Sequence, residues 1–332
     1  MAPLPTTPVK PALRDVAAAG ALLVLSAGMH VAAMFPPYSG NPATSVVSTP
    51  YQMAVYICLG LGWALAGLLV LTRLTVRGGV ALGAGLGLAE LGFLMTDLAG
   101  SLQVSARSTP GIWLAFAALA VGGAGVLLGA SVVPMGGARL RPYDEALHPR
   151  AFVTVLVSLL AVAAFVPSWD SYQFVTAAGR TATITLGNAF AQPAGVMAGE
   201  LVAAFAIGVV PILGAFWAPP AVGAWMTVGV VIALGSQLIS ALVQVNQPVL
   251  VTVAGERAAL SLTGCWAIDV AATVALAAMA AWAGLDARRT RVARPFPPVP
   301  AQPPGHSEPG HSEPGHPEPG QWPPTGGWPA AG

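Results

Sequence analysis

Eight long runs of apolar residues dominate this sequence and are almost free of charged side chains. They occupy residues 16–35, 51–71, 78–99, 111–133, 151–167, 194–217, 221–243 and 259–285. A helix needs about 20 apolar residues to cross the hydrocarbon core of a bilayer, and every backbone polar group must be satisfied within the segment. We therefore expect an all-α integral membrane protein, a polytopic bundle of eight transmembrane helices.

The scarcity of charge excludes several other classes of protein. Lys and Arg number 14 and Asp and Glu number 13, which is 8% of 332 residues, compared with about 25% in soluble domains. The net charge of +1 provides no basic field for a nucleic acid. With two cysteines, neither a disulfide framework nor a thiol-based zinc cluster is expected. The sequence predicts no cofactor and no metal site.

The basic residues predict the orientation of the chain in the membrane. If the N-terminus is cytoplasmic, 11 of the 14 basic residues lie on the cytoplasmic side, and the three on the other side are Arg107, Arg180 and Arg257. This asymmetry predicts that both termini are cytoplasmic. The strong preference for arginine over lysine is typical of GC-rich coding, so we expect the plasma (inner) membrane of a bacterium. The first run is longer than a signal-peptide core, so we expect it to be retained.

Three regions follow from these boundaries. Residues 1–15 form a cytoplasmic N-terminal tail, 16–285 form the transmembrane domain, and 286–332 form a cytoplasmic tail rich in Pro, Gly and His. The last region has too little apolar surface to fold and is expected to be disordered. Its two Pro-x-x-Pro spacings could dock a protein partner, with Pro295, Pro298 and Pro300 as candidate contacts. The alternative is an inert solvated tail.

The two halves of the transmembrane domain resemble one another in outline. Phe35-Pro-Pro-Tyr38 follows the first run and Phe165-Val-Pro-Ser-Trp169 follows the fifth, and Gly-x-Trp occurs near the start of the fourth and eighth runs. A 4+4 tandem repeat, as in some transporters, and convergent composition both account for these matches. Between the fifth and sixth runs, Thr alternates with apolar residues over 180–186. This pattern fits either a short hairpin or a plain polar connection.

Five ionisable residues inside the runs are the candidate functional residues. They are His30, Glu90, Asp97, Glu200 and Asp269. A charge near mid-bilayer costs at least about 2.5–3.5 kcal/mol, so these side chains should face partner helices or a water-filled cavity. No Lys or Arg lies within the runs to neutralise the four acids. We expect a polar cavity that opens outward and ends near Glu90 and Asp269. The alternative is that protonated carboxyl groups hydrogen-bond between helices as structural links.

The third run supports an inward position for two of these acids. Gly79, Gly83, Gly87, Glu90, Leu94 and Asp97 share one helical face. Its Gly-x-x-x-Gly steps permit close helix packing, so the acids should face the protein interior.

The sequence leaves three classes of function open. An acidic interior without basic partners favours a proton- or cation-coupled transporter or permease that moves a small solute or cation. The Pro-rich tail and the small-residue faces suggest, as an alternative, a non-catalytic accessory or scaffold subunit of a membrane complex. An intramembrane lipid-processing enzyme is less favoured, because no His-Glu-x-x-His or serine nucleophile elbow is present.

Overall fold

The computed structural model describes residues 13–39, 44–105, 109–133, 139–140, 148–175, 179–185, 189–246, 251–253 and 256–292. The chain separates into one unit over Met1–Arg291 and a second over Val292–Gly332. The first unit contains the helical bundle and all of the features discussed below. The predicted tail begins at residue 286, but residues 286–292 continue the last helix in the structure. The rest of the tail, with Pro295, Pro298 and Pro300, lies outside the described residues.

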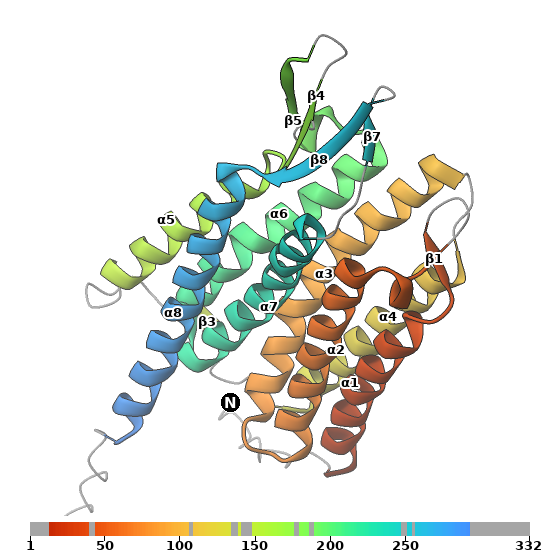
Figure 1. Cartoon of the computed structure of the whole chain (residues 1–332). Coiled ribbons are helices and arrows are strands. Elements are labelled where there is room, and N and C mark those ends of the chain that lie inside the picture. The colour runs from red at the N-terminus through yellow and green to blue at the C-terminus, as the bar shows by residue number, and fades with distance from the viewer. Residues whose placement is uncertain are drawn as a thin grey trace, which may run out of the picture. The chain divides into compact units, whose positions relative to one another are not determined.

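Eight long helices form the bundle within the described residues (Figure 1). They are α1 (Leu13–Ala33), α2 (Pro50–Leu71), α3 (Val76–Ser105), α4 (Pro110–Val132), α5 (His148–Phe165), α6 (Ala194–Ala215), α7 (Pro220–Val245) and α8 (Gly264–Val292). Seven of them are long and apolar enough to cross a membrane, and α5 is shorter, with an apolar part at Pro149–Phe165. The all-α, multi-pass architecture is therefore confirmed, while a membrane crossing by α5 stays a prediction.

A four-stranded antiparallel sheet lies at one end of the bundle, where α5 ends and α8 begins (Figure 1). Its strands are β4 (Asp170–Val175), β5 (Thr181–Thr185), β7 (Val251–Val253) and β8 (Glu256–Leu262), in the order β5-β4-β8-β7. Tyr172 pairs with Ile184 on one side and with Leu260 on the other. The hairpin alternative for the alternating Thr segment is confirmed. This end of the bundle is called the sheet end below.

The predicted start of the last apolar run, at residue 259, is wrong. Residues 259–262 belong to β8, and α8 begins at Gly264. The backbone groups of β8 are satisfied by pairing with β4 and β7, so this stretch does not need helical hydrogen bonds. Because Ala258, Ala259 and Leu260 are apolar, composition alone could not separate this strand from the helix that follows.

Two smaller two-stranded sheets lie in other connections between the helices. Strands β1 (Pro37–Ser39) and β2 (Thr44–Ser45) pair after α1, followed by the 3-10 turn Val46–Ser48. At the opposite end of the bundle, β3 (Arg139–Leu140) pairs with β6 (Trp217–Ala218). At that end an ion pair with an N–O distance of 3.2 Å joins Arg150 on α5 to Asp286 on α8.

Helix α3 is the central helix and packs against α2, α4, α6 and α7. On the face predicted from the glycine spacing, a Cβ at Gly79 would lie 2.5 Å from the Ala66 carbonyl oxygen of α2. On another side of α3, a Cβ at Gly85 would lie 2.0 Å from the Met226 carbonyl oxygen of α7. Helix backbones can approach this closely only at glycine, because any Cβ would clash. Such close packing matters in lipid, where no hydrophobic effect drives helices together. The predicted inward position is confirmed for Gly79, Glu90 and Leu94, which are buried, whereas Asp97 at the end of this face is exposed.

The substitution Gly85→Ala tests the close crossing of α3 and α7. The added methyl group would overlap the α7 backbone, so we expect Gly85→Ala to lower the free energy of unfolding by about 1–3 kcal/mol or more. Gly100→Ala on the same helix is the matched control, because no atom lies within 4 Å of a Cβ at that position. Unfolding in detergent, followed by intrinsic fluorescence, measures both. Equal stability of the two variants would contradict the close α3–α7 crossing.

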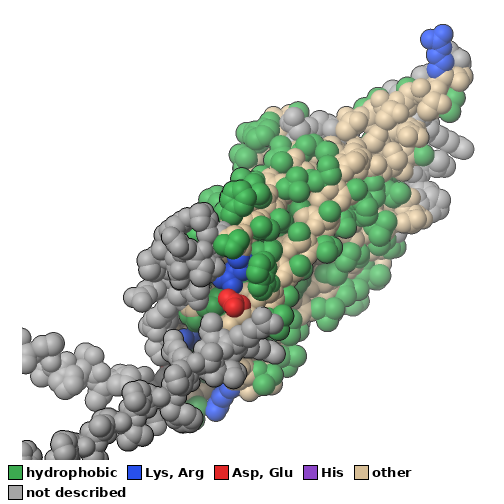
Figure 2. Space-filling view, turned by 90° about the vertical axis from the view of Figure 1, so that its left-hand side faces the viewer, with side chains coloured by type: hydrophobic (Ala, Val, Ile, Leu, Met, Phe, Trp, Pro, Cys, Tyr) green, Lys and Arg blue, Asp and Glu red, His purple; other side chains and the backbone are tan. Residues whose placement is uncertain are grey.

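Large apolar side chains cover the flanks of the bundle. Figure 2 shows one flank where hydrophobic groups spread along the helices, with few charged groups between the two ends. Leu61 on α2 and Leu127 on α4 are 65% and 73% exposed, respectively. Such a surface is stable in contact with lipid chains, as the apolar runs predict.

Candidate functional site

A fully buried polar cluster joins α1, α2 and α3. His30 and Glu90 each have 0% exposure, and His30 Nε2 contacts Glu90 Oε1 directly. The Trp63 indole N–H on α2 donates to Glu90 Oε2 over 2.7 Å. Both oxygens of the only acid in this cluster are therefore hydrogen-bonded, which offsets part of the cost of burying it.

The hydrogen bonds of His30 limit the protonation states of the pair. His30 Nδ1 lies 2.8 Å from the Ser26 carbonyl oxygen, and a carbonyl oxygen only accepts, so Nδ1 carries a proton. The contact between Nε2 and Oε1 then needs one further proton, located on either atom. In both cases the pair has no net charge. This neutrality explains how an acid is accommodated deep within the bundle.

A second group of polar side chains lies at the sheet end of α1, α2 and α3. The Tyr38 hydroxyl in β1 donates to Asp97 Oδ2 on α3 over 2.7 Å. Burial, with the nearby Asp97 carboxylate, raises the pKa of Tyr38 well above its ordinary value. Thr109, just before α4, fixes the Tyr38 backbone by donating to its carbonyl oxygen.

Tyr56 on α2 lies between these two groups. Its ring centroid is 5.4 Å from that of Tyr38 and 6.3 Å from that of His30. Tyr56 is 2% exposed, and its hydroxyl has no hydrogen-bond partner of good geometry among the described residues. The hydroxyl groups of Tyr56 and Tyr38 nevertheless interact, so Tyr56 links the side of the buried pair to the Tyr38–Asp97 hydrogen bond.

A polar cavity of about 400 Å³ opens next to Asp97, here called the α3–α6 cavity. Asp97 from α3 and Glu200 from α6 both line it, and the side chain of Asp97 is exposed. The other lining residues are uncharged: Tyr38, Gln52, Thr96, Gly100, Ser101, Gln103, Gln192 and Val196. Among the described residues, therefore, no basic side chain lines this cavity, and its two acids give it a negative potential.

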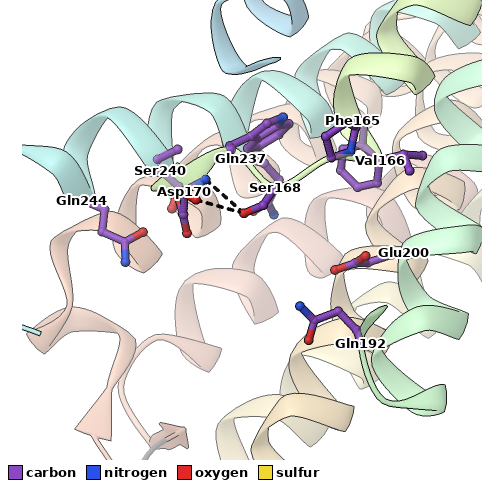
Figure 3. A pocket seen from close by; sticks show the side chains of 12 residues that line it. Phe165, Val166, Ser168, Asp170, Gln192, Glu200, Gln237, Ser240 and Gln244 are labelled. Carbon is purple, nitrogen blue, oxygen red and sulfur yellow. Dashed lines mark hydrogen bonds between the residues drawn. The ribbon is translucent and has the colours of Figure 1, made fainter. Parts of the chain in front are cut away.

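A neighbouring cavity of about 300 Å³ shares Gln192 and Glu200 with the first and is called the α5–α7 cavity. In Figure 3, Glu200 and Gln192 lie on one side of it, and Asp170, Gln237, Ser240 and Gln244 lie across from them. Ser168 is held beside Asp170 by hydrogen bonds with the Asp170 backbone. Burial raises the pKa of the Asp170 carboxyl group. Glu200 thus belongs to two adjoining polar spaces at the sheet end.

Asp269 on α8 is separate from both cavities. It has 0% exposure, and neither carboxylate oxygen has a hydrogen-bond partner among the described residues. Thr273, one turn along α8, is likewise buried without a partner for its hydroxyl. An ionised carboxylate in this setting would be very costly, so the geometry favours the protonated acid.

The five predicted residues therefore fall into three places. Asp97 and Glu200 line a common cavity, His30 and Glu90 form the buried pair, and Asp269 lies alone. The predicted ending of the cavity at Glu90 and Asp269 differs from the structure, in which these two residues line neither cavity. Helical spacing predicts how deep each side chain lies in the membrane, but it does not predict which helices are neighbours.

Four contributors were missed in the sequence: Tyr38, Tyr56, Trp63 and Asp170. Aromatic residues are common at membrane interfaces, so the first three carried no distinctive signal. Asp170 follows the fifth apolar run and is therefore not among the ionisable residues inside the runs. A cluster of three or more His, Cys, Asp or Glu side chains suited to a metal ion is not found in the described part of the chain. Comparison of the chain with known protein families, with curated proteins and with solved structures finds no match.

Proposed function

We propose that this protein is a proton- or cation-coupled transporter or permease, and that its solute or cation enters through the α3–α6 cavity. The observation that carries the proposal is the placement of Asp97 and Glu200, from two different helices, in one open polar cavity without basic residues among its described lining. Acids exposed within a membrane domain commonly mark ion or proton pathways. The adjoining α5–α7 cavity extends the polar space toward Asp170.

The distribution of arginine supports an outward-facing cavity. Arg180 and Arg257 belong to the sheet end, whereas Arg73, Arg77 and Arg150 lie where α2, α3 and α5 end or begin at the other end. By the positive-inside rule the sheet end faces away from the cytoplasm, in a bacterial plasma membrane. In this orientation α5 completes eight crossings and both termini are cytoplasmic.

A tandem 4+4 repeat is part of the same proposal and is supported by two pairs of glycines. Gly79 packs on the α2 backbone, and Gly223 packs on the α6 backbone at Gly214. At the α3–α7 crossing, Gly85 meets the Met226 carbonyl and Gly229 meets the Leu82 carbonyl. The same spacing along the chain separates Gly79 from Gly223 and Gly85 from Gly229. Such two-fold related packing is typical of transporters built from parallel repeats.

Charge movement across a solid-supported membrane tests the transport proposal. Purified protein in liposomes is exposed to pH jumps, to Na⁺ or K⁺ steps and to a panel of small solutes. We expect a solute-dependent current that falls at least about tenfold in Asp97→Asn and in Glu200→Gln, because each substitution removes a negative charge that attracts the cation.

Asp15→Asn is the control for this experiment. Asp15 is an exposed acid in the first turn of α1, far along the helix from the cavity. Its substitution should leave the current unchanged. Currents of equal size in the wild type and in both cavity variants would contradict the assignment of the cavity.

A further inference from the structure

We propose that the buried His30–Glu90 pair is a proton-binding site, and that its proton exchanges with the α3–α6 cavity through Tyr56 and Tyr38. The inference rests on the proposed function in that it names the proton as the coupling ion. Proton binding itself can be measured on the purified protein without any transport, so the two proposals can fail separately.

The geometry makes the pair a holder of one proton. With Nδ1–H bonded to the Ser26 carbonyl, one proton between Nε2 and Oε1 satisfies both atoms. Loss of that proton leaves the imidazole lone pair facing a carboxylate, and gain of another leaves two donors facing each other. Either change adds a net charge to a site with 0% exposure and replaces an attractive contact by a repulsive one.

Groups on the neighbouring helices determine how easily the His30–Glu90 pair loses or gains a proton. From α2, Trp63 donates to Glu90 Oε2, so the carboxylate keeps one strong donor when the shared proton leaves. From α4, the Ala118 carbonyl accepts from the Ser26 hydroxyl one turn below His30. The nearest other titratable groups are Tyr56 on α2, and then Tyr38 and Asp97 toward the cavity. No Lys or Arg side chain faces the pair among these contacts.

The hydroxyl groups between the pair and the cavity form the route for the proton. Tyr38 donates to Asp97, so in this arrangement its O–H points toward the cavity. For release, Tyr38 gives its proton to the Asp97 carboxylate and receives one from Tyr56. Tyr56 in turn receives the proton that leaves Nε2, through one water molecule. Asp97 becomes neutral, both tyrosines are unchanged, and the pair goes from neutral to a single negative charge.

The Tyr56 hydroxyl is the observation that favours this route, because it interacts with the Tyr38 hydroxyl but makes no hydrogen bond of full geometry. It is buried between the His30 ring and the Tyr38 ring, where a purely structural residue would be a phenylalanine. Loss of the shared proton also weakens the link between α1 and α3. Protonation is thereby coupled to the packing of these two helices, which is the differential contact that a transport cycle needs.

Proton release from protein in detergent, measured with a pH indicator and by infrared spectroscopy of the carboxyl groups, tests the inference. After a step from mildly acidic to alkaline pH, Glu90→Gln should release one proton fewer per molecule than the wild type and lack one carboxyl band. The glutamine amide can donate to His30 Nε2 and accept from Trp63, so this variant should fold. Asp97→Asn, which removes the acceptor at the cavity end of the route, should slow proton release and lack a different carboxyl band, so the two carboxyl groups can be told apart.

The rate of release tests the route. Tyr56→Phe should slow proton release at least about tenfold and leave the number of protons unchanged, whereas Tyr51→Phe, on the same helix, should change neither. Equal proton release by the wild type and Glu90→Gln overturns the binding site, and an unchanged rate in Tyr56→Phe overturns the route. Normal proton release with no solute-dependent current would contradict the proposed transport function alone.

Discussion

Glu90→Leu is expected to lower the free energy of unfolding by about 3–5 kcal/mol, the largest loss of stability expected for a single change in this protein. The substitution removes the partner of two buried groups, the His30 Nε2 atom and the Trp63 indole N–H. Both are sealed from water, so neither can recover a partner. Reversible unfolding in mixed micelles, followed by far-ultraviolet circular dichroism, measures the difference from the wild type.

Glu90→Gln is the matched control for this prediction. It keeps the shape of the side chain and both hydrogen bonds, so its stability should lie within about 1 kcal/mol of the wild type. The double variant His30→Leu with Glu90→Leu removes both members of the pair and should recover part of the loss seen in Glu90→Leu. If Glu90→Leu were as stable as Glu90→Gln, the buried cluster would not hold α1, α2 and α3 together as described.

Asp269→Leu is expected to have the opposite effect and to raise the free energy of unfolding by about 1–3 kcal/mol. The Asp269 carboxyl group has 0% exposure and no hydrogen-bond partner among the described residues, so the folded state bears its full desolvation cost. Leucine has a similar branched shape and no polar atom. The same unfolding assay measures the gain.

Thr273→Val, one turn further along α8, provides a scale for that gain. It removes another buried hydroxyl without a partner, and a neutral hydroxyl costs less to bury than an acid, so a smaller increase is expected. A decrease in stability for Asp269→Leu would mean that the carboxyl group has a partner in the folded protein. A gain in stability with a loss of current would identify Asp269 as a residue kept for activity at a cost in stability.

The sequence predicted the bundle well because the membrane imposes one dominant rule. Runs of apolar residues must form helices in lipid, and most of the observed helices begin and end within a few residues of the predicted limits. The exception at 259–262 arose where apolar residues entered a sheet instead. The glycine face of α3 was predictable because helical periodicity alone places Gly79 and Glu90 on one side.

The site was predictable in its residue types and not in its grouping. His30 and Glu90 are 60 residues apart and meet because α1 and α3 both contact α2. Periodicity gives the face and depth of a side chain but contains no information on which helices are neighbours. Tyr56 and Trp63 illustrate the same limit, because their importance comes from contacts with residues on other helices and strands.

The order of strands in the sheet has a consequence for biogenesis. Strand β4 emerges with the connection between α5 and α6, but its partner β8 belongs to the connection between α7 and α8. Until β8 is synthesised, β4 pairs with β5 alone and presents an open edge. Closure of the sheet end is therefore a late event in synthesis, and a chain interrupted before residue 256 would display that open edge to the cell's quality-control machinery.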